Sequence, residues 1–371
     1  MTLLTDQISK MLKKAPYELN KKERDESLLN ICRSQIKFHI KNCDPYKEWY
    51  LKNNFKIPDK ISDLNEVPFI PSSVFKHLNL KSSSKKSKKI SSSGTTSQLK
   101  SNVYIDSKTS LNQTSALSKI LSSHIGKSRI PFFIIDLEPS KINQNNEMSA
   151  RYAGMAGYLI AAKKRFYMLK EINGDMVVCK ESLKALESAT KEGPVVVIGY
   201  TYMLWQFINK YKGLNQNIKL HKDSKIIHFG GWKKLSSEKI KKELLNQNIS
   251  KYFNTEVNNI LDIYGFTEQL GTIYVSKGDG GCSITDYSHV IVRDTNTLKE
   301  VKDGKYGFLQ FISCLPESYP GFSILNDDIG CISHREITNE GREIIHFEVA
   351  ERLKEAEARG CGDTLPEDYY L

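Results

Sequence analysis

The sequence lacks the cysteine patterns that mark metal-binding or disulfide-built proteins. Its 371 residues include seven cysteines, and none forms a CxxC pair. Zinc ribbons and thioredoxin-like redox chemistry are therefore unsupported. An odd, widely spaced set of cysteines is typical of a reducing compartment rather than of a disulfide framework.

Long apolar runs, repeats and a secretion signal are also missing. The most apolar stretch, Val195–Phe207, is interrupted by Gly199, Thr201 and Gln206 and is too short to span a bilayer. The first residues, Met1–Asp6, lack the charged and apolar regions of a signal peptide. No repeat appears at the periods of solenoids or propellers. We therefore expect a cytoplasmic protein without a membrane span.

Acidic residues are outnumbered by basic ones, which gives a formal net charge of +11. Such a charge suits nucleic acid, anionic membrane surfaces or phosphorylated ligands. Five of the lysines lie in the short stretch from Lys81 to Lys89. No aromatic interleaving and no recognised module accompanies them, so we do not expect nucleic-acid binding.

The apolar pattern predicts an α/β fold. Up to about residue 55 the spacing is helical, with apolar residues such as Leu28, Cys32 and Ile36 on one face. Beyond residue 100, apolar runs of strand length alternate with helical segments, as in sheets that are buried on both faces. The expected strands are 131–137, 176–179, 194–199, 225–229 and 259–264, and the expected helices are 149–166, 180–190, 202–211 and 236–247.

From about residue 284 the rhythm changes to strands and turns. Strands are expected at 289–292, 306–312, 330–333 and 343–349, with turns at Asp303-Gly304 and Asn339-Glu340-Gly341. This section is typical of an antiparallel sheet.

The lysine-rich stretch leads into Ser91–Gln98, which packs hydroxyls around a single Gly94. Backbone and hydroxyl donors of this kind suit a polyphosphate. No Gly-Lys-Ser or Gly-Lys-Thr follows at the spacing of a Walker A loop. Composition alone favours a flexible Ser/Lys linker.

Three further segments fall at strand ends, where open α/β sheets bind ligands. His228–Trp232 contains two glycines that would let a flat ligand approach, or it forms a tight turn with Trp232 in the core. Tyr264–Glu268 combines an aromatic ring, a glycine, a hydroxyl and a carboxylate, which suit a base, a phosphate and a hard cation. Asn326–Gly330 offers a carboxylate for a ribose diol, or forms an Asp-rich turn.

Taken in order, Ser92-Ser93-Gly94-Thr95-Thr96, Tyr264-Gly265-Phe266-Thr267-Glu268 and Asp328 resemble three motifs of the adenylate-forming superfamily: its phosphate loop, its Tyr-Gly-x-Thr-Glu motif and its ribose-binding Asp. Within that superfamily the chain resembles the LuxE-type acyl-protein synthetases, the long-chain-fatty-acid–protein ligases. Further likenesses are Pro71-x-x-Val74-Phe75-Lys76, Ser149-Ala150-Arg151, Gly199-Tyr200-Thr201, Gly230-Gly231-Trp232-Lys233 and Arg359-Gly360-Cys361.

The resemblance implies that a fatty acid and ATP form acyl-adenylate, and that the acyl group passes to an enzyme cysteine and on to a partner acyl reductase. It implies Mg²⁺ at Glu268, the α-phosphate at Thr267 and the ribose at Asp328. It implies that the β- and γ-phosphates are bound by Ser92, Ser93, Gly94, Thr95 and Thr96. The adenine would be bound by Gly230, Gly231 and Tyr264, and Trp232 and Gly265 belong to the same motifs.

Two more residues take roles by resemblance. Arg352 resembles the hinge motif and would reach the nucleotide, and Cys361 resembles the acyl acceptor. The alternative for Cys361 is a tail cysteine without a role. The implied fold is a large adenylate-forming domain with a smaller antiparallel β subdomain. Its core spans 1–349, with a helical segment at 1–66, and a hinge remnant with the tail follows at 350–371.

Several positions depart from the superfamily pattern. Ser97 replaces a second Gly of the phosphate loop, Glu351 the hinge Gly, and Asp327 the Gly before the ribose Asp. The usual C-terminal domain with its catalytic lysine is expected to be absent, so Lys100 or Lys233 could supply the cation. Two alternatives stay open. The altered phosphate loop motivates a non-catalytic nucleotide-binding scaffold, and the absent C-terminal domain argues against the other alternative, an acyl-CoA ligase.

Overall fold

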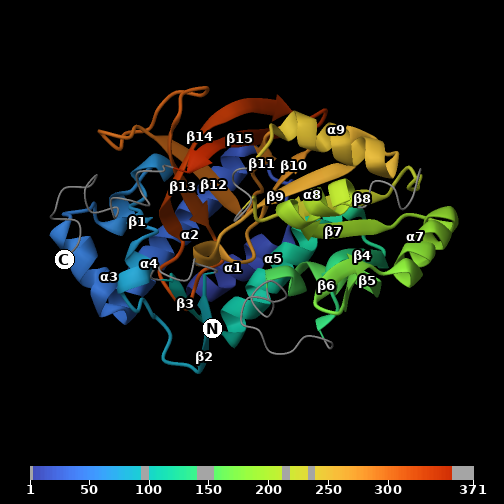
Figure 1. Ribbon diagram of the computed structural model, residues 1–371. Helices are drawn as coiled ribbons and strands as arrows, with labels where there is room; N and C mark the ends of the chain where they lie inside the picture. Colours follow the sequence, from blue (N-terminus) through green and yellow to red (C-terminus); the bar gives the residue numbers. More distant parts are fainter. Residues whose placement is uncertain (1–2, 93–99, 140–153, 211–217, 233–238, 353–371) are drawn as a thin grey trace. The chain divides into compact units, whose positions relative to one another are not determined.

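The computed structural model describes residues 3–92, 100–139, 154–210, 218–232 and 239–352. By its internal contacts the chain divides into two compact units. Unit 1 comprises residues 1–116, 265–272 and 283–371, and unit 2 comprises residues 117–264 and 273–282. Figure 1 shows the elements coloured along the sequence.

The N-terminal helices of unit 1 confirm the helical periodicity. They are α1 (Leu3–Lys13), α2 (Lys21–Asn42) and α3 (Asp44–Lys52), followed by single 3-10 turns at Pro58–Lys60 and Leu64–Glu66. The side chain of Asn20 accepts a hydrogen bond from the Glu23 N–H at the start of α2, and the Glu23 side chain answers in a capping box. Leu28, Cys32 and Ile36 are buried on one face of α2.

The C-terminal half of unit 1 is the expected antiparallel sheet. Its strands lie in the order β12 (Ser288–Arg293), β13 (Gly307–Ser313), β14 (Ser323–Ile337) and β15 (Glu343–Arg352). The short β1 (Ile70–Pro71) pairs with β14 in parallel. Gly304 and Gly341 have φ of 79° and 74°, which confirms glycine turns at both predicted positions.

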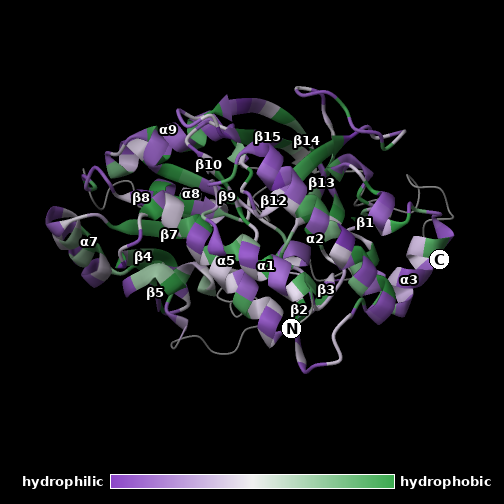
Figure 2. Ribbon diagram, turned by 180° about the vertical axis from the view of Figure 1, so that it is seen from behind, coloured by the Kyte–Doolittle hydropathy of each residue, from purple (hydrophilic) through white to green (hydrophobic). Residues whose placement is uncertain are grey.

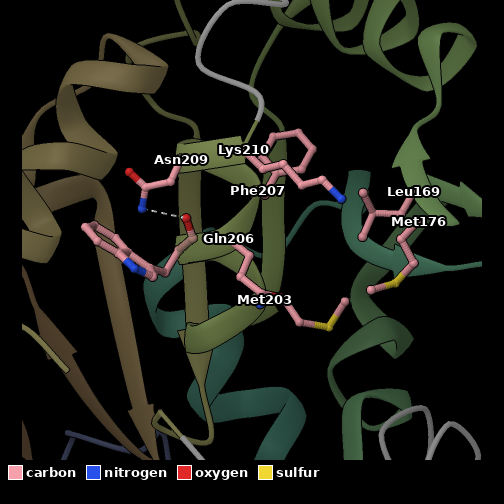
Figure 3. A pocket seen from close by; sticks show the side chains of 8 residues that line it. Leu169, Met176, Met203, Gln206, Phe207, Asn209 and Lys210 are labelled. Atoms are coloured by element: carbon pink, nitrogen blue, oxygen red, sulfur yellow. Dashed lines mark hydrogen bonds between the residues drawn. The ribbon is translucent and has the colours of Figure 1, made fainter. Parts of the chain in front are cut away.

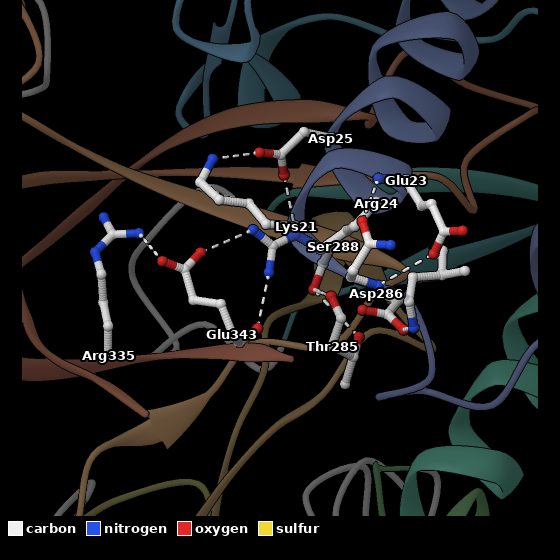
Figure 4. A network of polar contacts seen from close by, with 11 residues as sticks. Lys21, Glu23, Arg24, Asp25, Thr285, Asp286, Ser288, Arg335 and Glu343 are labelled. Atoms are coloured by element: carbon white, nitrogen blue, oxygen red, sulfur yellow. Dashed lines mark hydrogen bonds and ion pairs between the residues drawn. The ribbon is translucent and has the colours of Figure 1, made fainter. Parts of the chain in front are cut away.

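A buried arginine fastens α2 to this sheet (Figure 4). The Arg24 side chain is 2% exposed, and its guanidinium donates to the Glu343 carbonyl at 3.2 Å, to the Glu343 carboxylate at 3.4 Å and to Asp25 at 3.0 Å. The Glu343 carboxylate also pairs with Arg335. The backbone N–H groups of the α1–α2 connection, at Glu18 and Leu19, donate to the buried Asp286 carboxylate. A charged group such as the Arg24 guanidinium can be buried because it is paired with opposite charges and hydrogen-bonded.

The lysine-rich stretch differs from the loop expected from its composition. After α4 (Val74–His77), it enters β2 (Ser87–Ser91), which pairs with β3 (Asn102–Asp106) in a two-stranded antiparallel hairpin. At the base of this hairpin, the Ser82 N–H donates to the Ser318 carbonyl and the Ser83 hydroxyl donates to Asp106. These anchors, together with pairing to β3, fix as a strand a segment that composition alone predicted to be irregular.

Unit 2 is the predicted parallel sheet with helices packed on it. Its strand order is β10-β9-β8-β7-β4-β5-β6, where the pairs from β9 to β5 are parallel and the outer pairs β10–β9 and β5–β6 are antiparallel. The bounds are β4 (Ile130–Leu137), β5 (Ala162–Ile172), β6 (Asp175–Val178), β7 (Val196–Tyr200), β8 (Lys225–Phe229), β9 (Ile260–Tyr264) and β10 (Tyr274–Lys277). The short β11 (Cys282–Ser283) lies where the chain passes from unit 2 into unit 1.

The central strands of unit 2 are apolar on both faces. Phe132 to Ile135 and Val195 to Ile198 are fully buried, as expected for a sheet covered on both sides. Helix α8 (Thr201–Lys210) packs on β4, β7 and β8, beside α9 (Lys242–Phe253) on β9, while α7 (Lys180–Glu192) packs on β4 and β5. The hydropathy colouring of Figure 2 shows green central strands and mixed purple and green helices.

Two helix predictions were inaccurate, and one helix was missed. Of the expected helix 149–166, residues 162–166 belong to β5, because pairing with β4 overrides the local preference. The expected helix 236–247 begins later, at Lys242. Helix α5 (Ser107–Ile125) was not predicted at all. No helix in the described part of the chain combines the length and apolar character needed to cross a bilayer.

Candidate nucleotide site

The glycine pair and the tyrosine predicted to hold adenine leave neighbouring strands of unit 2. Phe229 of β8 pairs with Ile263 of β9, so Gly230 and Tyr264 follow side by side at the carboxyl ends of these parallel strands. Gly230 and Gly231 have φ of 78° and 62°, a backbone region that favours glycine. A Cβ on Gly231 would meet no atom of the described residues within 4 Å, so among them this bend is open on that side.

Trp232 is half-buried rather than part of the core. Its ring lies edge-to-face against Trp205 of α8, with the ring centroids 5.7 Å apart. The two glycines form a bend with positive φ angles, and the core interpretation is wrong for Trp232. The Trp232 side chain is therefore partly exposed beside the strand end.

His228 is a buried residue of this strand end to which no motif assigned a role. Its Nδ1 lies 3.0 Å from the Thr201 hydroxyl and 3.5 Å from an Asp262 carboxylate oxygen. The Thr201 hydroxyl also lies 3.2 Å from the Phe229 carbonyl, which can only accept, so we assign the histidine proton to Nδ1. Burial lowers the pKa of His228, which keeps the ring neutral at physiological pH. This contact ties together the ends of β7, β8 and β9.

The predicted phosphate and metal residues of the Tyr-Gly-x-Thr-Glu motif lie in unit 1. Directly after Tyr264 the chain enters unit 1, where Thr267 and Glu268 form a single 3-10 turn, η7 (Thr267–Gln269). Glu268 is only 7% exposed. Strand β3, which follows the predicted phosphate loop, packs against η7. Unit 1 therefore places the strand that follows this loop beside the turn that contains the predicted metal ligand.

Asp328 lies within β14, so the Asp-rich turn and the expected strand junction are both wrong. Its carboxylate accepts a hydrogen bond from the Asn326 side chain at 3.2 Å. Across the β14–β15 pair, Asp328 stands opposite Arg352, which brings two predicted nucleotide residues into register. The side chain of Gln269 bonds to Phe311, whose register partner Ile324 precedes Asp328 by four residues, or about 13 Å along a strand.

The rest of the predicted phosphate loop, Ser93, Gly94, Thr95 and Thr96, lies outside the described residues, as does Cys361. Ser92 is described. Its N–H donates to the Ser101 carbonyl at 2.9 Å, and its hydroxyl accepts from the Ser101 N–H at 3.1 Å. The two ends of the loop are thus joined at its base.

Glu268 fits the donor chemistry of a magnesium ligand. Mg²⁺ prefers carboxylate oxygens, and in nucleotide sites it is held by one or two carboxylates together with substrate phosphates. Among the described residues, no group of three or more His, Cys, Asp or Glu side chains could hold a metal ion without a substrate. A single carboxylate on a fixed turn suits a cation that arrives with ATP.

Unit 2 also contains an apolar pocket of about 340 Å³ that the sequence did not predict (Figure 3). Helix α8 supplies most of its wall, and β5 and β6 supply the remainder. Its lining residues are Leu169, Met176, Met203, Trp205, Gln206, Phe207, Asn209 and Lys210. None of these was a predicted site residue, although Trp205 contacts Trp232. Its volume lies at the lower end of the range for small-molecule sites.

Solved structures with the same fold include an open conformation of 2-hydroxyisobutyryl-CoA ligase in complex with 2-HIB-AMP and CoA. The likeness has a TM-score of 0.66 at 11% sequence identity and covers 91% of this chain and 77% of that chain. The same ligase in the postadenylation state in complex with R3-HIB-AMP gives a TM-score of 0.64 at 11% identity, over 89% of this chain and 67% of that chain. These likenesses confirm the adenylate-forming fold predicted from the sequence.

Sequence comparison identifies the family. A long-chain-fatty-acid–luciferin-component ligase of Vibrio harveyi is 22% identical over 366 residues, 95% of this chain and 91% of that protein. The ligase of the same name from Aliivibrio fischeri is 23% identical over 353 residues, 93% of this chain and 89% of that protein. The family model described as acyl-protein synthetase, LuxE, matches residues 3–370. The chain therefore belongs to the LuxE family of acyl-protein synthetases.

Proposed function

We propose that this enzyme activates a long-chain fatty acid with ATP and transfers the acyl group to protein. A carboxylate oxygen of the acid attacks the α-phosphorus of ATP, the bond to the bridging oxygen breaks, and acyl-adenylate and pyrophosphate form. The observation that carries the proposal is the family match over residues 3–370, and the names of both relatives supply the substrate class.

In unit 1 we assign the charged half of ATP. The hydroxyls and backbone N–H groups of Ser92 to Thr96 would bind the β- and γ-phosphates, Thr267 the α-phosphate and Asp328 the ribose hydroxyls. Bound at Glu268, Mg²⁺ would neutralise phosphate charge that otherwise repels the incoming carboxylate. The burial of Glu268 and the strand register that sets Asp328 opposite Arg352 support these roles.

In unit 2 we assign the adenine to the strand-end segments that contain Gly230, Gly231 and Tyr264. The positive φ angles of the glycines and the open side of Gly231 support a close approach of a flat ring. Trp232 would wall this position. The role of Arg352 at the nucleotide is assigned only from the hinge motif that it resembles.

We further assign Cys361 as the acyl acceptor. Its thiolate would attack the carbonyl carbon of the acyl-adenylate, forming a thioester and releasing AMP. The thioester would then pass the acyl group to a partner acyl reductase. A basic Arg359 two residues earlier would favour the thiolate.

The adenylation half of the proposal is tested by ATP–pyrophosphate exchange across a panel of carboxylic acids. We expect exchange with long-chain fatty acids and little exchange with short or aromatic acids. Undetectable exchange with every acid would overturn the proposal and favour a non-catalytic nucleotide-binding scaffold.

The transfer half is tested with labelled myristate, ATP and Mg²⁺ on a denaturing gel. We expect label on the protein, lost in Cys361→Ser, while pyrophosphate exchange persists in that variant. Cys331→Ser is the matched control, because Cys331 is buried in β14 and should leave labelling unchanged. Free acyl-CoA formed on adding CoA, with no labelled protein, would identify an acyl-CoA ligase instead.

A further inference from the structure

The turn with Thr267 and Glu268 is held in place by two side chains that no motif singled out. The buried Tyr319 hydroxyl donates to the backbone carbonyl of Glu268 at 2.9 Å. The Gln269 side chain is 1% exposed, and its amide nitrogen donates to the carbonyls of Phe311 and Gly321, both at 2.9 Å. These contacts join the turn to β13 and to the segment before β14.

The surroundings of Tyr319 direct its hydroxyl proton toward Glu268 and hold its ring in place. Its hydroxyl lies 3.5 Å from the Gln113 side-chain amide, which donates to it, so the hydroxyl proton is free for the Glu268 carbonyl. Its ring meets Phe75 edge-on, with the ring centroids 6.3 Å apart. A Cβ at Gly321 would lie 2.2 Å from the Tyr319 ring and 2.7 Å from the Glu268 carbonyl, so only glycine allows this close packing.

We propose that Tyr319 and Gln269 are positioning residues for the metal–nucleotide complex. They hold the backbone of η7, and through it the Glu268 carboxylate, where Mg²⁺·ATP is bound. The proposal rests on the function proposed above, and neither residue touches the nucleotide itself.

The chemistry of Mg²⁺ explains why the turn needs such support. Mg²⁺ demands near-octahedral geometry with short bonds. A carboxylate whose position varies therefore competes poorly with water as a ligand. A 3-10 turn has few hydrogen bonds of its own. Contacts behind a ligand of this kind commonly change metal affinity 10- to 100-fold when they are removed.

The test compares two tyrosines of unit 1. Tyr319→Phe removes the hydroxyl that reaches Glu268 and keeps the ring. Tyr287→Phe is the matched control, because Tyr287 is equally buried and its hydroxyl donates to the Lys14 carbonyl at 2.6 Å, remote in sequence from η7. Calorimetric titration measures the dissociation constants of ATP with excess Mg²⁺ and of ATP with a chelator.

We expect Tyr319→Phe to weaken binding of Mg²⁺·ATP about tenfold and to change binding of metal-free ATP less than about twofold. Tyr287→Phe should match the unaltered protein in both titrations. Equal weakening with and without metal, or no weakening in a folded Tyr319→Phe protein, would overturn the proposal while leaving the function intact. If the unaltered protein bound no ATP, both proposals would fail together.

A second variant covers the case in which Tyr319→Phe does not fold. Gln113→Met removes the donor behind the Tyr319 hydroxyl and leaves the tyrosine in place. We expect it to weaken Mg²⁺·ATP binding about two- to threefold, again with metal-free binding unchanged. Unchanged Mg²⁺·ATP binding in this variant would count against the proposal.

Discussion

The two units hold their predicted site residues by different means. In unit 2, Gly230 and Tyr264 stand directly on the ends of paired strands, and the backbone ladder between β8 and β9 positions them. In unit 1, Glu268 sits on an irregular turn that Tyr319 and Gln269 fasten from elsewhere in the chain. The ends of paired strands hold residues in position through the backbone hydrogen bonds of the sheet, whereas a turn needs contacts from buried side chains.

The largest expected effect on stability comes from substituting two glycines. Both have a positive φ, but they differ in how much room the surroundings leave for a Cβ atom. Gly271 of unit 1 has φ of 87°, and a Cβ there would lie 2.5 Å from the Gln113 Cα. Gly231 of unit 2 has φ of 62° and open space. The left-handed backbone costs an alanine about 1–2 kcal/mol at either site, and steric overlap adds about 1–3 kcal/mol more at Gly271.

Denaturant unfolding of Gly271→Ala and Gly231→Ala measures this difference. We expect Gly271→Ala to lose clearly more free energy of unfolding than Gly231→Ala, which should keep most of its stability. Similar losses in the two variants would mean that the turn of unit 1 is no more tightly held than the strand end of unit 2.

A second comparison uses one buried histidine from each unit. His39 of unit 1 is fully buried, its Nδ1 lies 2.8 Å from the Ser82 hydroxyl, and its ring stacks on Phe322. Burial lowers its pKa to about 3. In unit 2, burial also lowers the pKa of His228, but the nearby Asp262 carboxylate opposes the shift.

The sign of the effect follows from these directions. A histidine with a lowered folded pKa favours the neutral form, so its contribution is full above its unfolded pKa, about 6.5, and is lost as pH falls from there toward the folded pKa. At about 1.4 kcal/mol per pH unit, His39 should cost the folded state about 2 kcal/mol by pH 5. We expect a smaller loss from His228.

Unfolding free energies of His39→Asn, His228→Asn and the unaltered protein between pH 7 and pH 5 measure these contributions. We expect the pH dependence to become clearly shallower in His39→Asn and less so in His228→Asn. Carboxylates that titrate in all three proteins cancel in the comparison. An unchanged slope in His39→Asn would contradict a neutral buried ring.

The sequence predicted unit 2 better than the positioning contacts of unit 1 for a physical reason. Apolar runs such as Val195–Ile198 record burial on both faces directly, and glycine at 230 and 231 records the turn after a strand. Such signals lie within a few residues of each other. Element bounds failed where strand pairing overrode local preference, as in β5.

The contacts behind Glu268 could not be found in the same way. Tyr319 lies 51 residues from Glu268 along the chain, and Gln269 bonds to residues 42 and 52 positions away. Nothing local distinguishes a tyrosine with this partner from one that only fills a core. Asp328 was found because its motif resembles that of a family, although its place within a strand was not foreseen.

The smallest expected effect concerns surface ion pairs, one from each unit. Arg335 of unit 1 contacts both Asp303 oxygens, at 2.6 and 3.1 Å, and also Glu343, which in turn bonds the buried Arg24 (Figure 4). Lys170 of unit 2 has a single contact of 3.4 Å with Glu181, whose side chain is 74% exposed.

We expect Arg335→Gln to lose at most about 1 kcal/mol of unfolding free energy, because a two-pronged pair within a network exceeds the usual surface pair. Lys170→Gln should show no measurable loss, since solvent screens an exposed pair and ordering the lysine chain offsets the attraction. Unfolding measured in low salt and again near 1 M NaCl distinguishes the two ion pairs. At the higher salt concentration, interactions between solvent-exposed charges are screened within a few ångströms. Part of the Arg335 loss should persist in high salt, where the link through Glu343 to Arg24 is shielded from water. If the loss in Arg335→Gln vanished entirely in high salt, Arg335 would act as an independent surface charge. The stabilising network of unit 1 would then include Arg24 and Glu343 but not Arg335.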